Sequence, residues 1–185
     1  MSKSVEIICV LDRSGSMENI MDEAISAFNG FVDQQKKQVG KAKLTLAIFD
    51  DQYELLYDRI KLKQVPVLTI EDASPRGMTA LYDAIGRTVC NAKPDRQTIC
   101  LIQTDGMENS SQEYSAKKLK ALVDDRTKKG WEFVFIGAGI DAFAAGNSFG
   151  LSIEQCVNVT NTSEGMKEFG EVLCQRSSSF RGGFD

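Results

Sequence analysis

The apolar run Val5-Glu6-Ile7-Ile8-Cys9-Val10-Leu11 leads directly into Asp12-Arg13-Ser14-Gly15-Ser16. Such a run predicts a buried β-strand, and the amphipathic segment that starts near Met17 predicts a helix. The polar stretch therefore lies on a strand-to-helix turn, with one carboxylate and two hydroxyls at alternate positions. Alternate residues of an extended turn point the same way, so these oxygens can converge on one point. Hard oxygen ligands favour Mg²⁺, Mn²⁺ or Ca²⁺ over zinc or copper.

Apolar strand-like runs alternate with amphipathic helical segments along the rest of the chain. Strands are expected at residues 5–11, 42–49, 53–62, 98–102, 131–136 and 155–159. Helices are expected near residues 17–38, with Ser16 as the cap, and near 79–91, 112–129, 141–149 and 163–178. Because strands that alternate with helices pair in parallel, the pattern predicts a sheet with helices on both faces.

The turn at Asp50-Asp51 is too short for a crossover, so residues 53–62 should pair antiparallel and form a sheet edge. The predicted fold is thus a single doubly wound α/β domain with a mostly parallel six-stranded sheet and one antiparallel edge strand. We expect this domain to span residues 1–178. The Ser/Gly-rich residues 179–185 are expected to form a flexible C-terminal tail.

The composition is that of an ordinary globular protein of 185 residues, 42% hydrophobic and 26% charged. A net charge of −4 argues against nucleic acid as a partner. The chain has no basic amphipathic segment and no apolar stretch that could span a bilayer, which argues against a membrane. Its five cysteines include no Cys-x-x-Cys pair, and its N-terminal apolar run is too short for a signal peptide. We therefore expect a cytoplasmic protein.

The chain contains no histidine. This absence excludes Ser-His-Asp and Cys-His nucleophile systems, and it excludes zinc sites with histidine ligands.

The carboxylates that follow two of the predicted strands suggest where a ligand binds. In doubly wound sheets, ligands bind at the carboxyl ends of strands, where the winding reverses. Asp12 ends the first strand and Asp105 follows strand 98–102, so both face one crevice if these strands are neighbours. The predicted metal ligands are Asp12, Ser14, Ser16, Thr79 and Asp105. Two carboxylates roughly neutralise a divalent cation, which leaves it able to accept an outside carboxylate.

The sequence resembles the von Willebrand factor A-type (VWA) domains, which share their Rossmann-like fold with integrin I domains. Their metal-ion-dependent adhesion site (MIDAS) reads Asp-x-Ser-x-Ser, then a Thr on a second loop and an Asp on a third. Here these are Asp12 to Ser16, Thr79 in Arg76-Gly77-Met78-Thr79, and Asp105 in Thr104-Asp105-Gly106. Residues 136–143 also resemble the family's loop after the fifth strand. The chain resembles compact single-domain bacterial and phage members more than secreted adhesins.

The resemblance implies an intact metal site and a protein-binding function. Ser14, Ser16 and Thr79 would coordinate Mg²⁺ directly, and Asp12 and Asp105 would bind it directly or through water. A partner protein would complete the coordination with an Asp or Glu side chain. The alternatives are a metal-dependent hydrolase acting on a phosphoester, and self-assembly in which the chain's own carboxylate acts in trans, giving a homo-oligomer.

Three further residues are candidates for the rim of the crevice, each with a simpler interpretation. Glu108 and Asn109 follow Asp105 and are otherwise part of a solvated loop. Asp141 can approach from a neighbouring loop or can cap the helix that follows it.

Other interpretations of these motifs fit less well. A calcium-binding helix-loop-helix would need Gly in place of Met17. An aspartyl phosphotransferase would need a second carboxylate beside Asp12. Gly137-Ala138-Gly139-Ile140-Asp141-Ala142 fits a dinucleotide fingerprint, but no acidic residue ends the next strand. A VWA fold that has lost its metal remains open, with Ser16 serving only as a helix cap.

Overall fold

The apolar run that opens the chain forms the centre of the sheet. In the computed structural model, which describes residues 4–182, β1 (Val5–Asp12) pairs in parallel with β2 (Ala42–Phe49) and with β4 (Thr98–Thr104). Every residue of β1 is buried, as expected for a strand that helices cover on both faces.

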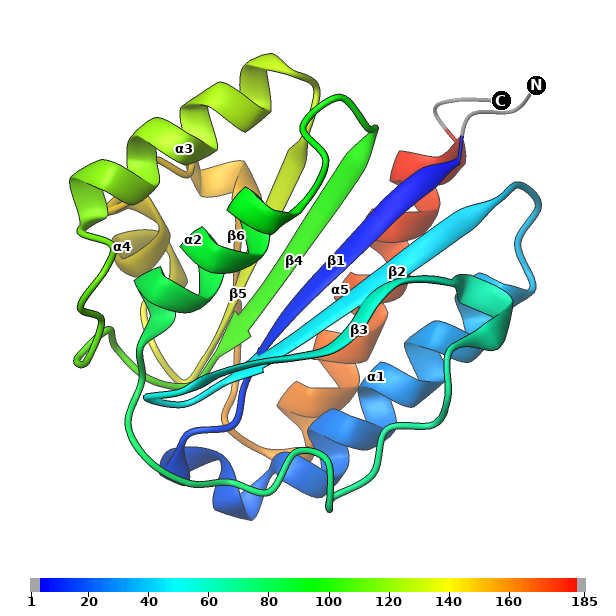
Figure 1. The fold of residues 1–185 in the computed structure, drawn as a ribbon. Coiled ribbons are helices and arrows are strands. Elements are labelled where there is room, and N and C mark those ends of the chain that lie inside the picture. Colours follow the sequence, from blue (N-terminus) through cyan, green and yellow to red (C-terminus); the bar gives the residue numbers. More distant parts are fainter. Residues whose placement is uncertain (1–3, 183–185) are drawn as a thin grey trace.

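The remaining strands extend the sheet on both sides of this centre. They are β3 (Tyr53–Lys61), β5 (Glu132–Ala138) and β6 (Cys156–Val159). Within residues 4–182 the sheet has six strands in the order β3-β2-β1-β4-β5-β6, and β3 is the antiparallel edge (Figure 1). The predicted doubly wound α/β fold is therefore confirmed.

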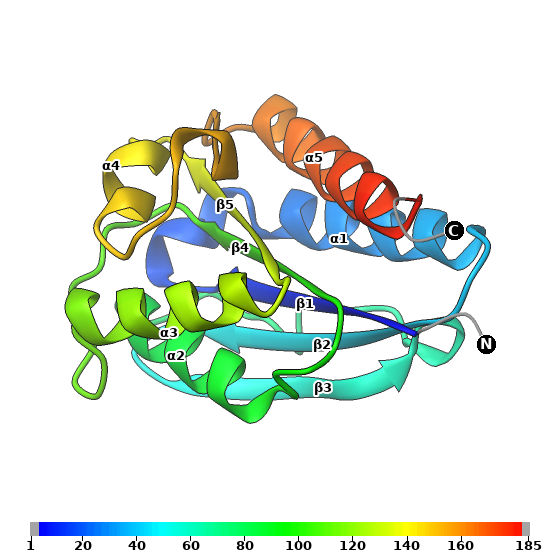
Figure 2. The same cartoon turned by 90° about the horizontal axis from the view of Figure 1, so that it is seen from above.

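Two apolar layers hold the helices to the sheet. α1 (Met21–Lys36) and α5 (Ser163–Gly182) pack on one face, and α2 (Leu81–Asn91) and α3 (Ala116–Lys128) on the other (Figure 2). The short α4 (Ala142–Asn147) follows β5 and joins the second layer. Short 3₁₀ turns complete the described elements at Gly15–Asn19, Leu62–Gln64 and Ile153–Gln155. Among residues 4–182, no helix is long and apolar enough to cross a membrane.

The winding reverses between β1 and β4, because the chain runs from β1 to β2 on one side and later returns to β4 on the other. Both strands are parallel, so their carboxyl ends open onto the same crevice.

The start of the first helix differs from the prediction. A 3₁₀ turn occupies Gly15–Asn19, and α1 begins only at Met21. The Ser16 hydroxyl donates to the carboxylate of Asp105 and does not cap a helix. The predicted cap is wrong because a carboxylate far away in the sequence accepts the hydrogen bond of this hydroxyl.

The C-terminal boundary also differs. α5 continues through Gly182, with Phe180 and Arg181 buried. The Arg181 guanidinium donates to the carbonyl oxygens of Gln35, Val39 and Gly40 around the end of α1. These contacts outweigh the weak helix propensity of a Ser/Gly-rich sequence. The predicted boundary at residue 178 and the flexible tail are wrong for residues 179–182, and residues 183–185 lie outside the described part.

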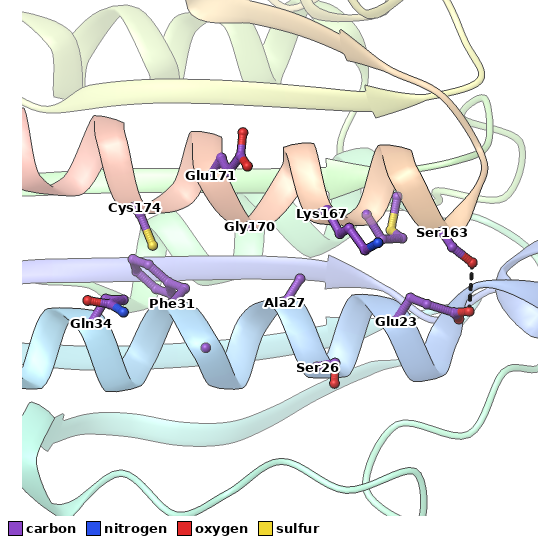
Figure 3. A pocket seen from close by; sticks show the side chains of 12 residues that line it. Glu23, Ser26, Ala27, Phe31, Gln34, Ser163, Lys167, Gly170, Glu171 and Cys174 are labelled. Atoms are coloured by element: carbon purple, nitrogen blue, oxygen red, sulfur yellow. Dashed lines mark hydrogen bonds between the residues drawn. The ribbon is translucent and has the colours of Figure 1, made fainter.

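Small residues set the packing of α1 against α5. A Cβ atom added to Gly170 would lie 3.2 Å from the Cβ of Ala27, and a groove of about 540 Å³ runs between the two helices (Figure 3). The Ser163 hydroxyl donates to the Glu23 carboxylate at 2.9 Å and ties the helices together at one end of this groove. Since Ser163 begins α5 directly after the loop that follows β6, this contact fixes the loop near the carboxyl edge of the sheet.

Two glycines in these helices should respond in opposite ways to alanine. In Gly165→Ala the new Cβ would lie 1.8 Å from the Thr160 carbonyl oxygen, so the backbone must shift, and we expect a loss of about 1–3 kcal/mol in the free energy of unfolding. In Gly30→Ala nothing lies within 4 Å of the new Cβ, and we expect a gain of about 0.5–1 kcal/mol. Urea unfolding followed by circular dichroism measures both. Equal effects of the two substitutions would contradict this account.

Candidate metal centre

Three loops meet at the carboxyl edge of the sheet between β1 and β4. The register pairs Leu11 with Gln103, so the ends of the two strands lie side by side. Asp12 ends β1, and Asp105 directly follows β4. Thr79 arrives from the segment that leads into α2. The predicted adjacency of the two strands is confirmed.

Hydrogen bonds connect four of the five predicted ligands. The Ser16 hydroxyl donates to Oδ1 of Asp105 at 2.6 Å, and the Oγ atoms of Ser14 and Ser16 lie 3.1 Å apart. The backbone N–H of Ser14 donates to Oδ1 of Asp12 at 2.6 Å, and the Thr104 hydroxyl donates to the other oxygen of that carboxylate. The donors from the first and third loops therefore form one cluster.

Thr79 lies beside the same cluster. A Cβ atom added to Gly106, the residue after Asp105, would lie 3.1 Å from Oγ1 of Thr79. Thr79 is buried, and its backbone N–H and carbonyl both bond to Asn109, at 2.9 and 3.0 Å. The structure thus gathers all five predicted residues at this edge.

The two carboxylates are poorly solvated. Asp12 is only 1% exposed, and burial, with a smaller contribution from the charge of Asp105, raises the pKa of Asp12 to about 6. Burial also raises the pKa of Asp105. Within residues 4–182, no salt bridge reaches either carboxylate. Adjacent buried carboxylates without a basic partner favour a bound cation, which would stabilise their charged forms.

The chemistry of the donors limits which cation fits. Among the described residues, no group of three or more His, Cys, Asp or Glu side chains could hold a metal ion. A metal at this edge would therefore depend on the hydroxyls of Ser14, Ser16 and Thr79 as well as on the carboxylates. All of these donors are hard oxygens, and the set fits Mg²⁺, Mn²⁺ or Ca²⁺.

Asp50 fixes the loop that carries Thr79, and the sequence did not reveal this role. Its fully buried carboxylate accepts from Nε of Arg13 at 3.2 Å and from Nε of Arg76 at 2.7 Å. Its backbone carbonyl accepts from the N–H of Ala80, the residue after Thr79, at 2.9 Å. One carboxylate thereby connects the turn after β1, the β2–β3 turn and the approach to α2. These residues are far apart in the sequence and follow no short-range pattern.

The turn after β1 and the segment that leads into α2 are also joined through their backbones. The N–H of Arg76 donates to the carbonyl of Arg13 at 2.8 Å, and the N–H of Gly15 donates to the carbonyl of Gly77 at 3.2 Å. Gly77 has φ +67°, and a Cβ there would lie 2.0 Å from Oδ1 of Asp51. Only glycine fits this close approach, which places Thr79 next to the turn that carries Ser14 and Ser16.

The three candidate rim residues all make internal hydrogen bonds. The Glu108 carboxylate accepts from the backbone N–H groups of Tyr82, Ser110 and Ser111 and from the Ser111 hydroxyl. Asn109 bonds to Thr79, as described above. Asp141 accepts from the N–H of Ala144, so the prediction that it caps a helix is confirmed. These side chains support the loops around the cluster.

Asn161 contacts the cluster as well, and the sequence did not reveal this role. Its Nδ2 atom donates to Oδ2 of Asp105 at 3.4 Å, from the loop between β6 and α5. Gly139 allows this approach, because its φ is +70° and a Cβ there would lie 2.9 Å from the Cβ of Asn161. The glycine-rich stretch after β5 therefore makes room for a residue that contacts Asp105.

No protein-family model and no curated protein matches the sequence. Solved structures do match it. One is proximal thread matrix protein 1 from the mussel byssus with a zinc-occupied MIDAS motif, at 17% identity and TM-score 0.72 over 95% of this chain and 46% of the other. A von Willebrand factor type A protein from Catenulispora acidiphila matches at 15% identity and TM-score 0.63 over 94% and 42%. The pilus adhesin SpaC from Lactobacillus rhamnosus GG matches at 14% identity and TM-score 0.75, over 98% of this chain and 31% of the other.

This chain has the fold of a von Willebrand factor type A domain. The chain spans less than half the length of each of these three structures. In this VWA fold, the cluster around Asp12 and Asp105 lies at the sheet edge where the winding reverses.

Replacing Asp50 with asparagine should destabilise the protein much more than the same change next to it. Asp50→Asn removes the buried charge that faces Arg13, which would keep only its ion pair with the exposed Glu54. We expect a loss of about 2–4 kcal/mol in the free energy of unfolding. Asp51 is exposed, and an asparagine there can still accept from the N–H of Met78, so Asp51→Asn should cost under about 0.5 kcal/mol. Urea unfolding of both variants tests this, and similar costs would be inconsistent with the proposed role of Asp50.

Proposed function

We propose that this chain is a divalent-metal-dependent protein-binding module and that it does not act as an enzyme. Asp12, Ser14, Ser16, Thr79 and Asp105 would hold Mg²⁺, and a partner protein would complete the coordination with an Asp or Glu carboxylate. The observation that carries the proposal is the hydrogen-bonded cluster of Ser14, Ser16 and Asp105, which unites oxygen donors from two loops at a sheet edge without a basic partner.

The charge of the site supports an anionic ligand. Two carboxylates roughly neutralise Mg²⁺, and hydroxyl ligands add no charge, so the ion would remain attractive to a further carboxylate. Ser16 is exposed, which leaves one side of the cluster open to a partner. When bound, the ion would supply a positive charge at this open side.

The side chains around the cluster argue for binding over catalysis. A hydrolase that used a metal-activated water would need a free base beside the metal. With Asp12 and Asp105 holding the metal, Glu108 would be the candidate base, but its carboxylate accepts hydrogen bonds from the start of α2 and from its own loop. The chain has no histidine that could replace it.

The comparisons supply two supporting facts. The matching byssus protein is named as a matrix protein whose MIDAS motif holds zinc, a divalent ion. The matching SpaC protein is named as a pilus adhesin. Both names are consistent with protein binding through such a site. The cytoplasmic location, the bacterial or phage origin and the homo-oligomer stay predictions.

Mg²⁺ should raise the melting temperature of the wild-type chain relative to EDTA. A ligand at 100 times its Kd stabilises a protein by about 2.7 kcal/mol, which shifts the melting temperature by several degrees. Asp105→Asn keeps an oxygen for the Ser16 hydroxyl but removes a charge, so it should abolish the Mg²⁺-dependent shift. Differential scanning calorimetry measures the effect.

Asp141→Ala is the matched control for this experiment. It removes the cap of α4 and should cost about 0.5–2 kcal/mol, yet the Mg²⁺-dependent shift should be unchanged. A shift that survives in Asp105→Asn, or that disappears in Asp141→Ala, would argue against the proposed ligands.

Partner binding should depend on the metal. In a pull-down with the immobilised chain, a specific partner should be retained in Mg²⁺ and released by EDTA. Asp12→Ala should retain nothing in either buffer, since Asp12 is a proposed ligand. A partner that stays bound to Asp12→Ala would show that binding does not use this site.

A further inference from the structure

We infer that the metal centre has an apolar rim, formed by Met78 and Met107, and that this rim selects a partner carboxylate flanked by large apolar side chains. The inference rests on the proposed function and specifies the kind of partner. Met78 directly precedes Thr79, and Met107 directly follows Gly106. Their side chains are 54% and 57% exposed, so both large apolar groups lie in solvent beside proposed ligands.

The two methionines border the same small area. Thr79 and Gly106 are in close contact, because a Cβ on Gly106 would lie 3.1 Å from Oγ1 of Thr79. Asn109, two residues after Met107, exchanges two hydrogen bonds with Thr79. The loops that carry Met78 and Met107 are thus joined next to the proposed metal ligands, and both exposed methionines border that area.

Hydrogen bonds fix the backbone under both side chains. The N–H of Met78 donates to Oδ1 of Asp51 at 3.3 Å, and the carbonyl of Gly77 accepts from Gly15 at 3.2 Å. The N–H of Gly106 donates to the Thr104 hydroxyl oxygen at 3.1 Å. Because the backbone is held this way, each methionine is presented to solvent at a defined position. Methionine suits such a surface, since its flexible thioether adapts to differently shaped apolar partners.

Two charged residues near the rim, Glu108 and Arg76, already have partners within the protein. Glu108 accepts from the backbone at the start of α2, and the Arg76 guanidinium bonds to Asp50. The two exposed methionines are the large apolar groups that this area offers to a partner besides the ion. A segment with several consecutive carboxylates would face a chain of net charge −4 and two site carboxylates, and the nearby Arg76 guanidinium is already paired with Asp50. The surface therefore fits a single Asp or Glu with Leu, Ile, Met or Phe within about two residues of it.

A phage-displayed library of random peptides, selected on the immobilised full chain in Mg²⁺ and eluted with EDTA, tests the inference. The eluted peptides should contain an Asp or Glu with a large apolar residue within two positions. Against M78Q/M107Q, which keeps similar side-chain lengths, selection should still require the acid and Mg²⁺ but should lose the apolar preference. Peptides selected on the wild type should bind this variant at least about tenfold more weakly.

Ile153→Gln is the matched control. Ile153 is 63% exposed and lies just before β6, the outer strand that β5 separates from β4, so this change should leave selection and affinity unchanged. Acidic, EDTA-eluted peptides without an apolar preference, or with unchanged affinity for M78Q/M107Q, would overturn the rim while leaving the proposed function intact. Retention of no peptide in Mg²⁺, or of peptides without a carboxylate, would overturn the proposed function itself.

Discussion

The candidate site depends on the parallel pairing of β1 with β4. Their register places the end of one strand beside the end of the other, so Asp12 and Asp105 share one buried edge. Thr104, the last residue of β4, bonds to Asp12 although 92 positions separate the two in the sequence. Burial raises the pKa of both carboxylates, and the charge of Asp105 raises that of Asp12 further. The backbone pairing that builds the sheet thus creates a local excess of negative charge, which a cation can neutralise.

Pairing of the strands does not by itself bring Thr79 to this edge. Thr79 belongs to a long segment that crosses from β3 to α2, and such segments have little regular structure of their own. The buried carboxylate of Asp50 and two backbone hydrogen bonds to the turn after β1 supply the missing constraint. The site therefore has two kinds of support. The sheet fixes the two carboxylates, and the buried carboxylate of Asp50, paired with Arg76, fixes the loop that carries the Thr79 hydroxyl.

Local patterns predicted the sheet, its antiparallel edge and the place of the five donors, because strand and helix periodicity and tight turns are properties of short segments. What failed depends on contacts between distant residues. The local sequence predicts that Ser16 caps a helix, but in the structure its hydroxyl donates a hydrogen bond to Asp105. The Ser/Gly-rich C-terminus reads as a tail until Arg181 is seen to bond to the end of α1. The sequence did not indicate that Asp50 and Asn161 support the site, since neither belongs to a site motif and their partners lie in other loops.

The hydrogen bonds within the cluster hold its donors in place without using up their capacity to coordinate. A serine hydroxyl that donates its proton still has two acceptor lone pairs, and a carboxylate has about four lone-pair positions. When Ser16 donates to Asp105, the oxygens of both residues keep free lone pairs. By contrast, Glu108 accepts four hydrogen bonds, which occupy its carboxylate and leave it to support the loop. This difference separates the oxygens available to a metal from those that position the loops around it.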